Sequence, residues 1–296
     1  MSKIKEMKKI KILIPIYNDW QSVFKLLENI NSEVLNLNYE FSVIIVNDAS
    51  TENRTQMSLN LEKLKSIKII NMKENRGHGR CNAAGLKFIF EKEEFDYAIL
   101  MDGDGEDRPE EIKQFIDKIN YSSNKPIVGE RVKRSESILF KFCYRIHKIL
   151  TLSFTGKSIK FGNFACLPKS VVEKMINEKA TWNAFSGSLV KISKDRTAIS
   201  SIRGTRYYDK SKMSYFNLVL HSLSIISVFR INVLIRSTIF LAVYIFLILQ
   251  HISVVTLIPV ALVIIMIFSI FALSRRGNIT ELNNSLENIN NIENLK

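Results

Sequence analysis

Cysteine is scarce in this sequence, and a secretory signal is missing. The 296 residues contain three cysteines, Cys81, Cys143 and Cys166, and none of them belongs to a Cys-x-x-Cys pair. This argues for a reducing compartment and against a structural zinc site. The first residues, MSKIKEMKKIK, are basic but have no apolar core before the first expected strand, so we expect no signal peptide.

Charge is absent from one long stretch near the end of the chain. Between Arg236 and Arg275 there is no charged residue, a run too long for one membrane span of about 20 residues but sufficient for two. We expect spans at about 233–250 and 254–274, and Pro259 is tolerated inside the second. A buried helical hairpin in a soluble core is the alternative. The polar break between the spans consists of Gln250, His251 and Ser253.

Acidic residues are outnumbered by basic ones, which gives a net charge of +13. This excess is either a compositional habit of a chain rich in Lys, or an attraction to anionic headgroups and phosphorylated substrates. Nucleic acid is not an expected partner, because no binding module is recognisable and the basic residues are spread out.

Apolar runs alternate with amphipathic ones through the first half of the chain. The expected strands are 9–16, 40–46, 67–72 and 97–101, and the expected helices are 20–30, 81–90 and 112–119. Strands buried on both faces and separated by helices predict an α/β fold with a mostly parallel sheet and flanking helices.

An acidic turn follows the last of these strands. Asp102 and Asp104 stand two residues apart, so their side chains share one side of an extended segment at the carboxyl end of a buried strand. Two oxygen donors there suit Mg²⁺ or Mn²⁺ held together with substrate phosphates. Asp107 alone is better explained as a cap of the helix that begins near Pro109.

The loop at residues 75–80, Asn-Arg-Gly-His-Gly-Arg, precedes an expected helix. Its two glycines allow a phosphate to approach the helix N-terminus, and an ordinary strand–helix turn explains it equally well. His78 is expected to be a turn residue rather than a catalytic base.

Ordered motifs along the chain resemble glycosyltransferase family 2. In the first half they are Pro15-Ile-Tyr17-Asn18-Asp19, Val46-Asn-Asp48, Asn75-x-Gly77-x-Gly79 and Met101-Asp102-Gly-Asp104. Later stretches are similar to its polyprenyl-phosphate branch, which includes dolichol-phosphate mannosyltransferase. They are Gly129-Glu-Arg131-x-x-Arg134, Phe161-Gly162-Asn163-Phe164, Arg203-x-x-Arg206 and Asp209-Lys-Ser211-Lys212-Met213.

The resemblance implies a GT-A type, Rossmann-like fold and a role for each matching residue. Asp102 and Asp104 would hold a divalent cation, Mg²⁺ or Mn²⁺, on the diphosphate of a nucleotide sugar. The nucleotide-binding residues would be Pro15, Tyr17, Asp19, Asp48, Arg80 and Asp102. The catalytic residues would be Asp104, Asp107, Arg131 and Arg206. The residues facing the acceptor or its phosphate would be Arg134, Arg203, Ser211 and Lys212. For any one of these arginines, a solvated or headgroup-facing surface is the alternative.

The sequence departs from the branch at several positions. The frequent Asp-Ala-Asp-Leu-Gln-Asp is Asp102-Gly-Asp104-Gly-Glu106-Asp107 here, and the Gly-Asp-Phe turn reads Gly162-Asn163-Phe164. Asp209 replaces the glycine before Lys210 and Ser211. The metal pair is intact, while the identities of the sugar and of the acceptor stay open.

The expected reaction is a single inverting transfer of one sugar to polyprenyl phosphate. A hydroxyl acceptor would need a general base, and none is evident in the second half of the soluble part; Asp107 and Glu106 remain fallback candidates. The Gln/Arg-x-x-Arg-Trp signature of processive synthases is absent. The alternatives are transfer to a lipid-linked saccharide or lipid hydroxyl, and a non-enzymatic membrane-anchored scaffold with a degenerate transferase domain.

We expect four segments in a multi-pass protein of the cytoplasmic (inner) membrane. They are a cytosolic catalytic domain (1–213), an amphipathic interfacial helix (214–232), the membrane hairpin (233–275) and a cytosolic tail (276–296). Arg230 and Arg236 before the first span, and Arg275 and Arg276 after the second, place both ends in the cytosol. The interfacial segment either lies on the membrane or packs on the domain. The tail has a short helical stripe, Ile279 to Leu295, that either pairs with another subunit or is solvated.

Overall fold

The structure is a computed structural model that describes residues 7–54, 60–122, 124–133, 138–208 and 215–296. An eight-stranded sheet in the order β7-β5-β6-β4-β1-β2-β3-β8 forms its centre. The strands are β1 (Lys9–Ile16), β2 (Glu40–Asn47), β3 (Leu64–Met72), β4 (Tyr97–Leu100), β5 (Ile127–Lys133), β6 (Phe161–Pro168), β7 (Thr197–Ile202) and β8 (Ile289–Asn294). The pairs β3–β2, β2–β1, β1–β4 and β5–β7 are parallel, while β6 and β8 run antiparallel to their neighbours. The predicted mostly parallel α/β sheet is therefore confirmed.

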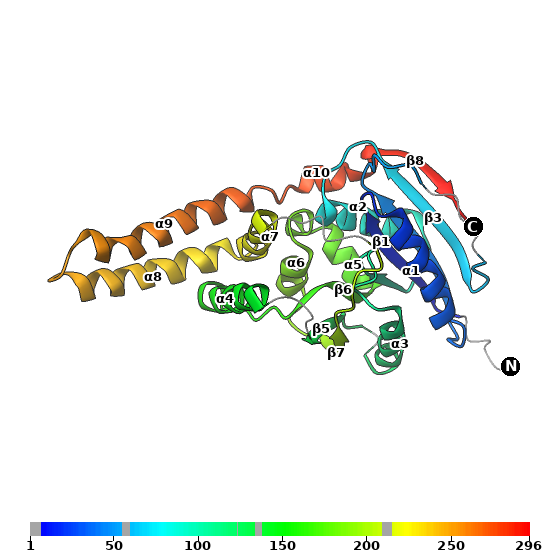
Figure 1. Ribbon diagram of the computed structural model, residues 1–296, viewed down its shortest axis with the longest axis horizontal. Helices are drawn as coiled ribbons and strands as arrows, with labels where there is room; N and C mark the ends of the chain where they lie inside the picture. Colours follow the sequence, from blue (N-terminus) through cyan, green and yellow to red (C-terminus); the bar gives the residue numbers. More distant parts are fainter. Residues whose placement is uncertain (1–6, 55–59, 123, 134–137, 209–214) are drawn as a thin grey trace.

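Helices cover both faces of this sheet (Figure 1). The helices of the described residues are α1 (Trp20–Glu33), α2 (His78–Lys92), α3 (Ile112–Tyr121), α4 (Ile138–Thr155), α5 (Lys169–Ile176), α6 (Phe185–Ile192), α7 (Tyr215–Ser227), α8 (Arg230–Ile248), α9 (Val254–Ser274) and α10 (Ile279–Asn283). One core joins α1 and α3 to one face, and a second core joins α2, α5 and α6 to the other. Burial on both faces explains why β1 and β2 are almost continuously apolar.

Helix α2 packs against β1 and β2 through Gly85, where a side chain has no room. A Cβ at Gly85 would lie 2.4 Å from Leu13 Cδ1 and 3.0 Å from Val46 Cγ2. We expect Gly85→Ala to destabilise the fold by about 1–3 kcal/mol, because overpacking forces the core to shift. Thermal unfolding in detergent measures this. Gly79→Ala on the same helix is the control, since its Cβ would meet only an atom 3.7 Å away. Equal melting temperatures for the two variants would contradict the packing argument.

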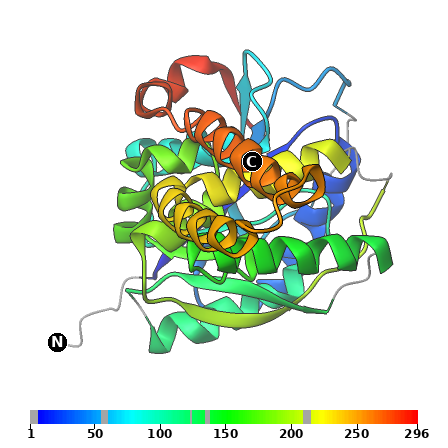
Figure 2. The ribbon, with the colours of Figure 1, turned by 90° about the vertical axis from the view of Figure 1, so that its left-hand side faces the viewer.

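Helices α8 and α9 form a long antiparallel hairpin that projects from the sheet domain (Figures 1 and 2). Both are long and apolar enough to cross a membrane, and only 11% of each apolar window is buried inside the protein. The low burial disfavours the alternative of a hairpin buried in a soluble core. The first helix begins at Arg230 rather than near residue 233, and the second has the predicted bounds, 254–274.

The segment expected to be interfacial ends earlier than predicted. Helix α7 covers 215–227, and the last residues of the expected segment already belong to α8. Its side chains divide between two environments: Ile225 and Ile226 are buried, whereas Phe216 and Val219 are exposed. Helix α4, which the sequence analysis did not foresee, also exposes apolar side chains and packs against α8.

The C-terminal tail is the clearest correction to the sequence analysis. It does not form the expected helical stripe: α10 is short, a 3₁₀ turn follows, and Ile289–Asn294 forms β8. This strand pairs antiparallel with β3 and completes one edge of the catalytic sheet. The chain therefore leaves the domain, forms the apolar hairpin and returns to the same sheet (Figure 1).

Candidate active site

The acidic turn lies at the carboxyl edge of the parallel strands, directly after β4. Asp102 Oδ1 lies 2.9 Å from His78 Nε2, at the start of α2. Asp104 Oδ2 accepts a hydrogen bond of 2.6 Å from Arg206 Nη1, and Arg206 Nη2 donates to Asp19 Oδ2 at 2.6 Å. Residues far apart in the sequence thus converge on the two carboxylates predicted to hold a metal.

The turn itself is stabilised by its own carboxylates. Asp107 Oδ2 accepts from the backbone N–H of Asp102 at 3.0 Å, and Asp104 Oδ1 accepts from that of Glu106 at 2.9 Å. The prediction that Asp107 caps a helix is wrong, because the residue preceding the 3₁₀ turn at Pro109–Glu111 is Arg108 and Asp107 bonds backward. Gly105 adopts φ +85°, a left-handed conformation that favours glycine.

Burial and mutual repulsion shift the titration of these acids. Burial, followed by the charge of Asp102, raises the pKa of Asp104 to about 6 and that of Asp107 to about 8. A buried carboxylate beside another acid is stabilised in its charged form by a nearby cation. The guanidinium of Arg206 supplies such a charge to Asp104. Among the described residues no three His, Cys, Asp or Glu side chains form a metal cluster. A bound cation would therefore need oxygen atoms from a ligand in addition to the aspartates.

Three arginines from distant segments surround the turn. Arg203 forms an ion pair with Glu106, and Arg131 Nη2 lies 3.9 Å from Asp107 Oδ1. The Nε of Arg206 is buried and has no hydrogen-bond partner among the described residues. Three members of the predicted cationic wall, Arg131, Arg203 and Arg206, thus lie beside the acidic turn, and their binding of phosphates stays a prediction. Arg134, Ser211 and Lys212 lie outside the residues whose side chains the structure describes.

Two polar residues near Asp102 were not assigned a role from the sequence. His78 Nδ1 lies 3.4 Å from Asn163 Nδ2, so the histidine connects Asp102 to β6. Helix α2 begins at His78, three residues earlier than expected, so His78 is the first residue of the helix rather than a turn residue. Its partner, Asp102, could not be named from the sequence. The available signal was the position of Asn163 in the Gly-Asn-Phe turn, where the family carries a carboxylate.

The residues expected to bind the nucleotide follow β1 and β2. Pro15 is the second-last residue of β1, and Tyr17, the residue after the strand, is 42% exposed. Asp48 is buried, and its two oxygens accept from the backbone N–H groups of Arg76 and Gly77, each at 2.8 Å. Asp48 therefore holds the loop after β3 against the end of β2.

Arg80 contacts the C-terminal tail rather than the acidic turn. Its Nη2 lies 3.7 Å from Glu281 Oε2, and its guanidinium lies over the Trp182 ring, 5.5 Å from the centroid. Whether this arginine also reaches a nucleotide phosphate stays a prediction.

The carboxyl edge of the sheet faces the apolar helices. Gly79, in the first turn of α2, lies against the carbonyl of Asn183. The Asn183 amide donates to Ser227 Oγ of α7 at 3.0 Å and to the Leu273 carbonyl of α9 at 3.3 Å. Asn183 thus connects the first turn of α2, which carries His78, to the apolar helices α7 and α9.

The fold and the acidic edge define the class of GT-A glycosyltransferases. Glucosyl-3-phosphoglycerate synthase from Mycobacterium tuberculosis, solved with Mn²⁺, UDP-glucose and phosphoglyceric acid, superposes with a TM-score of 0.55 at 10% identity, covering 76% of this chain and 80% of that one. TarS 1–349 from S. aureus, in complex with UDP-GlcNAc, gives 0.52 at 14% identity and covers 95% of this chain and 89% of that one.

The chain belongs to glycosyl transferase family 2, since the model of that family matches residues 11–172, more than half of its length. Two similar proteins are undecaprenyl-phosphate 4-deoxy-4-formamido-L-arabinose transferases. The one from Serratia proteamaculans is 26% identical over 225 residues, 74% of this chain and 67% of that protein. The one from Proteus mirabilis is 26% identical over 231 residues, with the same coverage. The family inferred from the motifs is confirmed.

Proposed function

We propose that this glycosyltransferase moves one sugar, with inversion, from a nucleotide sugar to a polyprenyl phosphate in the membrane. The position of the acidic turn carries this proposal: the carboxylates, three arginines and the start of α2 lie at the edge of the sheet that faces α7 and α9. An amphiphilic acceptor whose chain lies in the membrane beside the apolar helices can bring its charged head group to a site at this edge. The names of the two similar transferases support the same acceptor class.

Asp102 and Asp104 are the residues that would hold a divalent cation on the donor diphosphate. The donor set fits this role, because the two carboxylates stand two residues apart in one turn, are largely buried and contact His78 and Arg206, side chains that lie where a cation would bind. When bound, Mg²⁺ or Mn²⁺ acts as a Lewis acid that stabilises the leaving diphosphate. Arg206, which also pairs with Asp19, would supply a positive charge to a phosphate oxygen of the donor.

The acceptor phosphate needs no general base, because it is already ionised at neutral pH. This agrees with the state of the two fallback bases. Glu106 is paired with Arg203, and Asp107 is buried and bonded to the backbone of the turn. Arg131 and Arg203, which lie beside the acidic turn, would attract the acceptor phosphate and orient it toward the donor.

The return of the chain to the sheet supports a membrane topology with both ends on one side. Because β8 pairs with β3, both ends of the hairpin lie on the side of the catalytic domain. Arg230 and Arg236 precede or begin the first span, and Arg275 and Arg276 follow the second, which favours the cytosolic side. We therefore propose an inner-membrane protein whose site faces cytosolic nucleotide sugars.

The test uses full-length protein in detergent with polyprenyl phosphate, a panel of labelled nucleotide sugars and Mn²⁺ or Mg²⁺. We expect label to enter the organic phase with one donor, and chelation by EDTA to lower the rate at least about 100-fold, because the leaving diphosphate loses its counter-charge. Restoring Mn²⁺ should restore the rate. Transfer that persists after chelation would contradict the metal role.

Two other outcomes would favour one of the alternative functions. Nucleotide binding without transfer to polyprenyl phosphate would favour a lipid-linked saccharide or lipid hydroxyl as the acceptor. Failure to bind any nucleotide in the presence of metal would favour the scaffold hypothesis.

A further inference from the structure

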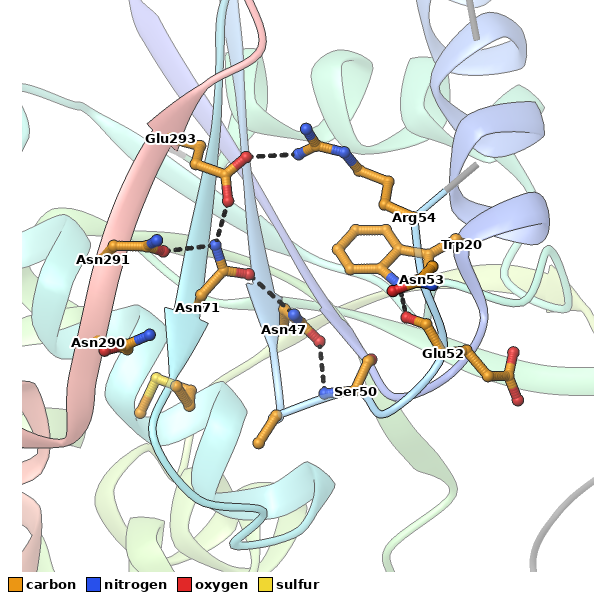
Figure 3. Close-up of a pocket in the computed structure, with 12 residues that line it drawn as sticks. Trp20, Asn47, Ser50, Glu52, Asn53, Arg54, Asn71, Asn290, Asn291 and Glu293 are labelled. Atoms are coloured by element: carbon orange, nitrogen blue, oxygen red, sulfur yellow. Dashed lines mark hydrogen bonds and ion pairs between the residues drawn. The ribbon is translucent and has the colours of Figure 1, made fainter. Parts of the chain in front are cut away.

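A cavity of about 630 Å³ lies where the C-terminal tail, Asn278–Lys296, meets the loop after β2 (Figure 3). One wall is β8, and the opposite wall is the loop 48–54 with the indole of Trp20. Polar residues dominate the lining, among them Asn47, Ser50, Asn71, Asn291 and Glu293. The tail thus forms part of the surroundings of the loop that carries Asp48.

A continuous chain of hydrogen bonds crosses from the tail to this loop. Asn71 Nδ2 donates to Glu293 Oε1 and to Asn291 Oδ1, each at 2.6 Å. Asn47 Nδ2 donates to Asn71 Oδ1 at 2.8 Å, and the N–H of Ser50 donates to Asn47 Oδ1 at 3.0 Å. Each amide uses both its ends, so its orientation is determined by its neighbours on β8 and in the loop (Figure 3).

The chain continues to the loop after β1. The N–H of Asn18 donates to Ser50 Oγ at 2.8 Å, and Asn18 Oδ1 accepts from the N–H groups of Thr51 and Glu52. Asn18 stands between Tyr17 and Asp19, two of the residues predicted to bind the nucleotide. The tail is therefore connected to both loops of the proposed donor pocket.

Each of the two loops contains one non-glycine residue in the left-handed backbone conformation. Asn18 has φ +51° and Ala49 has φ +54°. Such a conformation is strained for a residue that has a side chain, and it persists only where surrounding contacts determine it. The hydrogen bonds that lead back to Asn71 and Glu293 supply such contacts, so the shape of the pocket depends on the edge strand.

Two ion pairs hold the tail at opposite ends. Arg54 Nη1 donates to Glu293 Oε2 at 2.7 Å, on the far side of the cavity. At the other end, Glu281 accepts from Trp182 Nε1 at 2.7 Å and lies 3.7 Å from Arg80. The segment that follows the membrane hairpin is anchored to the catalytic domain both before and within β8.

We propose that the tail is a positioning element of the donor pocket, with Glu293 as the positioning residue that holds Asn71, Asn47 and the two loops in their binding conformation. This rests on the proposed function, in which those loops bind the nucleotide of the donor. Glu293 acts through its neighbours and is not placed against the donor itself. Part of the donor pocket is consequently completed by chain that has first passed through the membrane hairpin.

The test compares full-length wild type with Glu293→Ala, Glu293→Gln and the control Glu287→Ala. Glu287 lies exposed in the same tail, and its backbone carbonyl, not its side chain, accepts from Lys73. Binding of UDP, GDP and CDP with Mn²⁺ is measured by calorimetry, and donor KM and kcat are measured in the transfer assay. Hydrogen exchange of residues 48–54 reports on the loop, and the melting temperature reports on the fold.

We expect Glu293→Ala to weaken nucleotide binding and to raise donor KM by roughly fivefold, the size expected when one ordinary hydrogen bond is lost. The kcat at saturating donor should stay within about twofold, since the acidic turn is untouched. Exchange of the loop should accelerate. Glu293→Gln should recover about half of the effect, because its amide oxygen still accepts from Asn71, and Glu287→Ala should match wild type.

An unchanged KM and unchanged loop exchange in Glu293→Ala would overturn the inference while wild-type transfer leaves the proposed function standing. A loss of kcat with equal KM, or a loss in Glu287→Ala as large as in Glu293→Ala, would overturn it as well. Wild-type protein that binds none of the three nucleotides would overturn the proposed function, and the inference with it.

Discussion

Asp104→Asn is expected to lower the rate of sugar transfer by about 1,000-fold, which corresponds to about 4 kcal/mol of transition-state stabilisation. The physical reason is the loss of one charged ligand to a cation that neutralises the leaving diphosphate. The substitution keeps the size of the side chain and an oxygen for the N–H of Glu106, which now bonds to Asp104 Oδ1. The turn should therefore survive, and the loss should be in catalysis.

The measurement is the initial rate of label transfer at saturating donor and Mn²⁺, with the melting temperature taken in parallel. Asp117→Asn is the matched control, because Asp117 is exposed on α3 and away from the turn. It should retain the wild-type rate. If the transfer rate of Asp104→Asn fell by less than about tenfold, the proposal that Asp104 binds the metal would be wrong.

Arg206→Ala should change metal binding and turnover in opposite directions. Arg206 bridges Asp19 and Asp104, so it would compete with a cation for the Asp104 carboxylate. Without it, we expect Mn²⁺ to bind about fivefold more tightly in the absence of donor, equivalent to about 1 kcal/mol. Turnover should fall about 100-fold, because the variant lacks the guanidinium that would stabilise the leaving diphosphate.

Two further variants separate this role from simple charge loss. Arg206→Lys should fall between wild type and Arg206→Ala, since a single ammonium cannot span both carboxylates as the planar guanidinium does. Arg196→Ala is the control, because Arg196 donates to the Ser193 carbonyl away from the turn. Manganese binding is followed by calorimetry. Weaker Mn²⁺ binding in Arg206→Ala would contradict the competition between the arginine and the metal.

The sequence by itself determined the architecture of the catalytic domain. Apolar runs such as Ile10 to Ile16 are long enough to specify strands buried on both faces, and the structure has β1, β2, β3 and β4 within a few residues of their predicted bounds. The charge-free run from Arg236 to Arg275 likewise determined the hairpin. These signals are local, because a segment that is buried along its length consists of apolar residues that can be recognised within the segment.

The carboxylate pair of the site was also predictable, whereas its partners were not. Asp102 and Asp104 are neighbours in the chain and follow a strand, so their position at the sheet edge required no tertiary information. His78, Asn163 and Arg206 come from other segments, and only the packing of the sheet brings them together. The role of Asp107 was misjudged for the same reason, since a cap and a turn-closing acid look alike in sequence.

The tail shows what only the tertiary structure decided. Its apolar residues, among them Ile289 and Ile292, recur at a spacing typical of a helix, and this spacing predicts a helix for the segment. The open edge of β3 instead offered it hydrogen-bond partners, and Ile289–Asn294 became a strand. A helix this short gains little stability from its own sequence, so the partner determines its conformation. The sequence thus determined the sheet, the acidic turn and the apolar hairpin through patterns within single segments. The folded chain determined the cationic partners of the acids and the return of the tail, because those depend on contacts between segments.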